Sequence, residues 1–232
     1  MGAVLKRCAS LGYGALAAMR KLVLAGILVA SPLAADEAAD QAVIAMLGDS
    51  LTAGYGLAPD AGLVPVLERW LQAQGAQVRL INAGVSGDTT AGGLARIDWT
   101  LTPEVEGLVV ALGANDLLRG LDPAAARTNL RGILEAGRDA GVAILVVGVP
   151  APLNYGADYK AEFDAIYPDL AQEFGALYVE DLLAPMQEAT ADGTRLETFL
   201  QPDRLHPNPA GLELIVAGLG PQMLALVVRI AQ

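Results

Sequence analysis

The sequence predicts an α/β fold, a three-layer α/β/α sandwich around a parallel sheet of about five strands. After residue 40, short runs rich in valine, isoleucine and leucine alternate with longer amphipathic stretches. Short, nearly continuous apolar runs are typical of strands buried on both faces, and strands that alternate with helices form parallel units. With 232 residues, of which 53% are hydrophobic, the chain can build one sizeable core.

The expected elements follow in order along the chain. Five apolar runs are the expected strands: residues 43–47, 78–82, 108–112, 143–149 and 177–179. Three amphipathic stretches are the expected helices between them: residues 63–75, 123–141 and 157–175. Asp122 and Pro123 are typical of a helix N-cap and first helical residue, and Gly141 is typical of a helix end. Pro168 should break or kink the third helix after Tyr167, because proline removes a helical hydrogen bond.

The first 35 residues have the features of a secretory signal peptide. Arg20 and Lys21 precede the apolar run 22–30, which is followed by the polar and acidic stretch "SPLAADEAAD". The apolar run is shorter than the ~20 residues that span a bilayer, which argues against a permanent anchor. We therefore expect residues 1–35 to be removed by cleavage after Ala35.

The mature chain is expected to be a single domain, residues 36–232, in the periplasm or outside the cell. Translation can begin at Met1 or at Met19, since Met19 is followed directly by a complete basic region. Cys8 has no lipobox-like context, and the mature chain holds no cysteine.

Charge and composition argue against several kinds of partner. The formal net charge is -11 and the calculated pI is about 4.4, which disfavours nucleic acid or an anionic membrane. One histidine and one cysteine cannot build a typical zinc site, and the glycine-rich loops match no nucleotide-binding motif. We expect no metal, no cofactor, no obligate protein partner and no stable membrane insertion after signal removal.

Glycine and polar residues gather directly after three of the expected strands, as "GDSLTAGYG", "AGVSGDTTAGG" and "GANDLLRG". In open α/β sheets, ligands bind outside the carboxyl ends of the strands. The three loops should therefore form one composite site. Ser50, at the tip of the first strand, is either a nucleophile or the N-cap of the next helix, and both roles suit that position.

A serine nucleophile needs a base, which is normally a histidine oriented by a carboxylate. His206 is the only histidine, and Asp203 precedes it by three residues, a spacing compatible with a tight turn. Asn208 and Pro209 then read as the N-cap and first residue of the last helix. The alternative is that His206 is an ordinary loop residue.

Taken together, these residues resemble the SGNH/GDSL hydrolase family, whose fold is flavodoxin-like. Four blocks occur in order: Gly48-Asp49-Ser50-Leu51, Gly87 in "SGDTT", Gly113-Ala114-Asn115-Asp116 and Asp203-x-x-His206. The stretches "NAGVSGDTTAGGLARI" and "NYGADYKAEFDAIYPDLAQEFG" are closest to the periplasmic branch of multifunctional thioesterases, lysophospholipases and arylesterases. The resemblance runs from about residue 43 to the C-terminus.

The resemblance implies a Ser-His-Asp triad of Ser50, His206 and Asp203. It assigns the oxyanion hole to the backbone N–H groups of Ser50 and Gly87 and to the side-chain amide of Asn115. The residues agree, because a glycine permits close approach and an amide is a neutral donor. Taken alone, Asn115 could be a turn cap and Gly87 an ordinary loop glycine.

Other residues are assigned less directly by the family pattern. Asp49 and Asp116 are expected to hold loops through hydrogen bonds to the backbone. Four apolar residues are candidates for an acyl site, although such residues are more often ordinary core: Leu117, Leu118, Leu153 and Tyr155. The segment 189–203 looks longer than the usual approach to the Asp-x-x-His block, which leaves the pocket shape on that side open.

The sequence thus predicts an exported serine esterase that hydrolyses carboxylic esters or thioesters through an acyl-enzyme intermediate. Its expected substrates are small-molecule esters, thioesters or lysolipids. One alternative is a carbohydrate O-deacetylase on the same fold. A second alternative is a non-catalytic binding protein, which the intact set of site residues disfavours.

Overall fold

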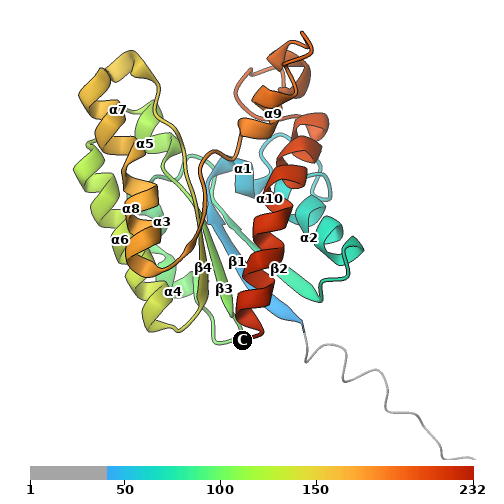
Figure 1. Cartoon of the computed structure of the whole chain (residues 1–232), viewed down its shortest axis with the longest axis vertical. Helices are drawn as coiled ribbons and strands as arrows, with labels where there is room; N and C mark the ends of the chain where they lie inside the picture. Colours follow the sequence, from blue (N-terminus) through green and yellow to red (C-terminus); the bar gives the residue numbers. More distant parts are fainter. Residues whose placement is uncertain (1–40) are drawn as a thin grey trace, which may run out of the picture. The chain divides into compact units, whose positions relative to one another are not determined.

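The computed structural model describes residues 41–232, so the expected signal peptide and its cleavage site lie outside the described residues. The described strands form one parallel sheet in the order β2-β1-β3-β4-β5 (Figure 1). Their bounds are β1 Ala42–Gly48, β2 Val78–Gly84, β3 Gly107–Ala111, β4 Ala143–Val147 and β5 Leu177–Val179. The predicted α/β fold with a five-stranded parallel sheet is confirmed.

The strand order brings three loops together. The chain passes from β1 to its neighbour β2 on one side and then crosses to β3 on the other side. Because the strands are parallel, the loops that follow β1, β2 and β3 all leave the same edge of the sheet. This point of reversal is where ligands bind in doubly wound sheets.

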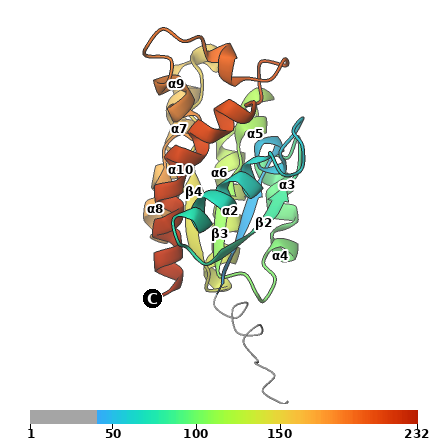
Figure 2. The ribbon, with the colours of Figure 1, turned by 90° about the vertical axis from the view of Figure 1, so that its right-hand side faces the viewer.

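Helices cover both faces of the sheet, as the views in Figures 1 and 2 show. Along β1, Ala45 and Leu47 contribute to one apolar core, whereas Ile44 and Met46 contribute to the other. The first core is closed by α3 (Thr90–Ala95), α4 (Ile97–Thr100), α6 (Pro123–Asp139), α7 (Ala157–Asp164) and α8 (Ile166–Phe174). The second is closed mainly by α2 (Leu63–Ala73) and α10 (Pro209–Ile230).

Short helices lie in the loops at the carboxyl edge. They are α1 (Ser50–Ala53), α5 (Ala114–Leu118), η1 (Leu153–Tyr155), α9 (Ala184–Glu188) and η2 (Leu196–Phe199). Among the described residues, α10 alone is long and apolar enough to cross a bilayer by length and composition. Its buried side chains, such as Leu212, Ile215 and Leu219, belong to the second core.

The helix caps agree with the sequence, and one helix break does not. Asp122 caps α6 by accepting a hydrogen bond from the N–H of Ala124, as predicted. The third helix was expected to break after Tyr167, but the break between α7 and α8 falls at Ala165. A proline excludes the hydrogen bond to the carbonyl four residues before it, so the discontinuity precedes Pro168, which then sits in the first turn of α8.

Candidate active site

Ser50 lies at the junction of β1 and α1. Asp49 is the N-cap of α1 and accepts a hydrogen bond from the N–H of Leu51, so Ser50 is the first helical residue rather than the cap. The junction is tight, because a Cβ on Gly48 would lie 2.0 Å from Oγ1 of Thr52. The strand therefore delivers the Ser50 side chain to the carboxyl edge of the sheet.

His206 and Asp203 share a turn just before α10. Oδ1 of Asp203 accepts from the N–H groups of Leu205 and His206, both at 3.0 Å, which closes the turn. Oδ2 of Asp203 lies 2.6 Å from Nδ1 of His206. Arg204, between them, has a φ of 58°. Asn208 caps α10 through the N–H of Gly211, as the sequence predicted, and fixes the end of the turn.

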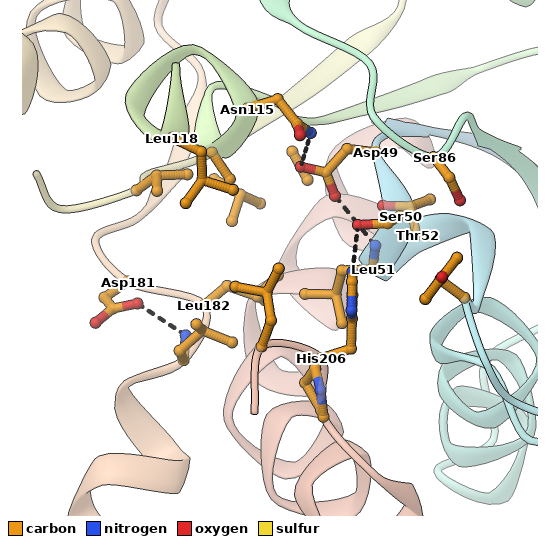
Figure 3. Close-up of a pocket in the computed structure, with 18 of the residues that line it drawn as sticks. Asp49, Ser50, Leu51, Thr52, Ser86, Asn115, Leu118, Asp181, Leu182 and His206 are labelled. Carbon is orange, nitrogen blue, oxygen red and sulfur yellow. Dashed lines mark hydrogen bonds between the residues drawn. The ribbon is translucent and has the colours of Figure 1, made fainter. Parts of the chain in front are cut away.

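The imidazole of His206 joins this turn to Ser50. Its Nε2 lies 2.8 Å from Oγ of Ser50, a contact drawn in Figure 3. The hydrogen bond to His206, together with those from the backbone, lowers the pKa of Asp203 to about 2. An ionised carboxylate can only accept, so Nδ1 of His206 donates to it, and in a neutral ring Nε2 is left to accept the Ser50 proton. This arrangement can activate a serine nucleophile.

Asn115 and Gly87 come from the loops beyond the two neighbouring strands. Asn115 lies in the first turn of α5, and its amide nitrogen donates to the Asp88 carbonyl at 2.9 Å and to Oδ2 of Asp49 at 3.3 Å. A capping side chain accepts a hydrogen bond from a backbone N–H through its oxygen, so the Asn115 side chain does not act as a cap. Gly87 has a φ of 81°, which favours glycine, and its carbonyl accepts from Arg119.

The two aspartates expected to hold loops both do so. Asp116 is buried and accepts from the backbone N–H and the hydroxyl of Thr90, which ties α5 to α3. Asp49 is also buried, and burial raises its pKa above the ordinary value, while the N–H of Leu51 opposes that shift. Asp49 also contacts Asn115, and nothing in the sequence predicts that contact.

Arg96 is a residue of the site that the sequence did not single out. Its guanidinium donates to the Asp88 carboxylate at 2.7 Å, to the Ala83 carbonyl at 2.7 Å and to the Gly48 carbonyl at 3.0 Å. These acceptors lie at the ends of β2 and β1 and in the loop that carries Gly87. Arg96 thereby fixes the three segments relative to one another. Its only sequence signal is its place three residues after the polar loop 83–93.

A cavity of about 630 Å³ opens beside Ser50 and His206. Its apolar lining comes from α1, α5, the carboxyl ends of β3 and β4, and the segment after β5: Leu51, Leu118, Ala111, Val147, Val149 and Leu182 among others. The expected strand 143–149 ends at Val147, so Val149 is free to face the cavity. No residue of the described segment 189–203 lines it.

Only one of the four residues proposed for an acyl site lines this cavity. Leu118 does so, whereas Leu117 is buried in the first core. Leu153 and Tyr155 are exposed on η1, with 68% and 42% of their surface accessible, outside the lining. Within residues 41–232, no group of His, Cys, Asp and Glu side chains is arranged to hold a metal ion.

The fold and the comparisons with known proteins define an ester-hydrolysing enzyme. Residues 46–214 match the GDSL-like Lipase/Acylhydrolase family, and the chain belongs to that family. It is 34% identical to the Esterase TesA of Pseudomonas aeruginosa over 210 residues, which cover 90% of this chain and 100% of the relative. It is 33% identical to an Arylesterase of Vibrio mimicus over 76% of this chain and 84% of the relative.

Two further similarities extend the comparison. The Thioesterase 1/protease 1/lysophospholipase L1 of Escherichia coli is 34% identical over 82% of this chain and 86% of the relative. The crystal structure of AlinE4, an SGNH-hydrolase family esterase, is 45% identical with a TM-score of 0.64 and covers 80% of this chain and 96% of its own. The family resemblance inferred from the sequence is thus confirmed.

Proposed function

We propose that this enzyme is an exported serine esterase that uses Ser50, His206 and Asp203 as its catalytic triad. The observation that carries the proposal is the continuous contact from Asp203 to Nδ1 of His206 and from Nε2 to Oγ of Ser50, at 2.6 and 2.8 Å. The pKa of Asp203, lowered to about 2, supports its role as the permanently ionised group that orients His206.

In the proposed reaction, Nε2 of His206 takes the Ser50 proton as Oγ bonds to the ester or thioester carbonyl. The carbonyl oxygen becomes an oxyanion, held by the N–H groups of Ser50 and Gly87 and the amide of Asn115. The intermediate collapses, the bond to the leaving group breaks, and His206 returns the proton to that group. Water, deprotonated by the same histidine, then attacks the acyl-enzyme. The bond between the acyl carbon and Oγ breaks, His206 returns the proton to Oγ of Ser50, and the acid leaves.

The apolar cavity supports esters of apolar acids as the substrates. Its lining surface is mainly apolar and includes five leucines and two valines, which favours a hydrocarbon chain over a sugar. Relatives named arylesterase, thioesterase and lysophospholipase support aryl esters, thioesters and lysolipids as substrate classes. Arg20, Lys21 and the apolar run that follows them support export.

Two experiments test this function. A fluorophosphonate probe should label the wild-type enzyme, and labelling should be absent from Ser50→Ala and His206→Ala. Normal labelling of either variant would exclude the proposed triad. A panel of p-nitrophenyl acyl esters, acyl thioesters and acetylated sugars then identifies the substrate class. A clear preference for the acetylated sugars would replace the esterase with a carbohydrate O-deacetylase.

A further inference from the structure

We infer that Asp49 is a positioning residue that fixes the Asn115 amide in the orientation required to donate to the oxyanion. The inference rests on the proposed function, since it gives Asn115 the role of oxyanion donor. Its basis is a contact between two residues 66 positions apart in the chain: Nδ2 of Asn115 donates to Oδ2 of Asp49 at 3.3 Å, as Figure 3 shows.

The surroundings of the amide determine which way it points. Nδ2 of Asn115 carries two hydrogens, and its two acceptors are the Asp88 carbonyl and the Asp49 carboxylate. A carbonyl and an ionised carboxylate only accept, so a flipped amide would place its oxygen against two other oxygens. The nitrogen is therefore fixed on the side of Asp49 and Asp88, in a residue that lines the cavity beside Ser50, before any substrate arrives. Pre-alignment of this kind is what makes an oxyanion donor effective.

Asp49 can hold the amide because it is itself held. Its Oδ1 accepts from the N–H of Leu51 at 3.1 Å, and the residue is only 7% exposed. One carboxylate thus joins the first turn of α1, where Ser50 lies, to the first turn of α5, where Asn115 lies. The distance between nucleophile and amide donor is set by this bridge as well as by the sheet.

The two bonds to the amide have different lengths, and this suits them to different tasks. The bond to Asp88 is 2.9 Å, and Asp88 is anchored in turn by Arg96 at 2.7 Å. The bond to Asp49 is longer, at 3.3 Å. A developing oxyanion can therefore share or take the hydrogen directed at Asp49, while the shorter bond to Asp88 keeps the amide in place.

A simpler account is that Asp49 only caps α1. Asparagine and serine cap helices about as well as aspartate, so on that account Asp49→Asn and Asp49→Ser should remain active. The positioning role predicts that both variants lose activity. In Asp49→Asn, the oxygen that continues to accept from Leu51 leaves an NH₂ group facing the NH₂ group of Asn115, and two donors cannot bond. In Asp49→Ser, the side chain is too short to bridge the two helices.

The test is a double-mutant cycle on p-nitrophenyl butyrate with Asp49→Asn, Asn115→Ala and the combined variant. We expect Asp49→Asn to lower kcat about 10- to 100-fold, less than the 10²–10³ of removing an oxyanion donor, with KM nearly unchanged. In the Asn115→Ala background, Asp49→Asn should lower kcat by no more than about twofold, because its effect passes through the missing amide. Asp49→Ser should reproduce the kcat loss, which covers the case in which Asp49→Asn folds poorly.

Asp122→Asn is the matched control, since Asp122 caps α6 through the same two-residue contact with a backbone N–H, outside the cavity lining. Its kcat should stay within about twofold of wild type and its melting temperature close to wild type, because asparagine caps a helix about as well as aspartate. Wild-type kcat in both Asp49 variants would overturn the inference. It would also be overturned if the fold-losses of kcat in Asp49→Asn and Asn115→Ala multiplied to give the loss in the combined variant. Wild-type kcat in Asn115→Ala would instead refute the proposed oxyanion hole.

Discussion

The ring of Tyr55 lies against the imidazole of His206, with the ring centroids 4.6 Å apart and the planes inclined by 37°. The backbone carbonyl of Tyr55 also accepts from the side chain of Gln201 at 2.8 Å, and the N–H of Gln201 donates to the His206 carbonyl at 2.7 Å. The loop after α1 thereby braces the turn that carries His206. The face of an aromatic ring also attracts the imidazolium cation that forms when His206 takes a proton.

Removing the Tyr55 ring should therefore weaken the proposed base. Tyr55→Ala is expected to lower kcat about tenfold, from a less well oriented histidine and the loss of about 1 kcal/mol of attraction for the cation. Tyr55→Phe keeps the ring and should keep most of the activity. Steady-state kinetics of the two variants decide the point, and equal losses in both would mean that the hydroxyl is the important group.

Asn115 is expected to act in the transition state rather than in substrate binding. Asn115→Ala should lower kcat on the order of 10²–10³ with little change in KM, and Ser50→Ala should be more severe. Asn115→Asp should be at least as poor as the alanine variant, since a carboxylate would face the Asp88 carbonyl and the Asp49 carboxylate and offers no donor. Near-normal turnover of Asn115→Asp would remove Asn115 from the mechanism.

The lowered pKa of Asp203 has a consequence for stability at low pH. Because the pKa falls from 3.8 to about 2 in the folded protein, ionised Asp203 stabilises the fold above pH 3.8, and this contribution is lost as the pH falls through about 2. Asp203→Asn should melt below the wild type at pH 5, and the difference should shrink between pH 4 and pH 2. A difference that stays constant over that range would contradict the assignment.

Close backbone packing at the end of β2 predicts that Gly84 cannot be enlarged. A Cβ on Gly84 would lie 2.2 Å from the backbone nitrogen of Ala53 in α1. Gly84→Ala should cost about 1–3 kcal/mol of stability, and kcat should fall because α1 carries Ser50. Gly132→Ala is the control, since its new methyl would meet only a side-chain end of Leu94, at 2.9 Å. Equal melting temperatures of the two variants would refute the argument.

Export predicts a defined N-terminus for the mature protein. Intact-mass measurement of the protein from the periplasmic or secreted fraction of its native host should give a chain that starts near Asp36. Recovery of the full-length chain from the cytoplasm alone would reject the signal peptide.

The sequence predicts the site better than it predicts the surroundings of the site. Ser50 and Asn115 could be placed together because parallel strands end at one edge and polar loops follow those ends. His206 could be added because a serine nucleophile needs a base and because the family resemblance implies the triad. The bridge from Asp49 to Asn115 could not be foreseen, since it depends on how two short helices face each other. The cavity wall was also missed at Val147 and Leu182, because whether an apolar side chain at a strand end faces core or cavity depends on the sheet's exact twist and length.

The contact between Ser50 and His206 joins positions 156 residues apart, within a described chain of residues 41–232. Closing so long a loop is entropically costly and comes late unless intervening structure has already formed. The nucleophile follows the first strand in the chain, and it meets its base only when the segment before the last helix has docked. A growing or partly folded chain would hold Ser50 without His206 beside it. During refolding, the rate at which Ser50 becomes reactive toward a serine-directed probe should therefore report the rate at which the whole fold is completed.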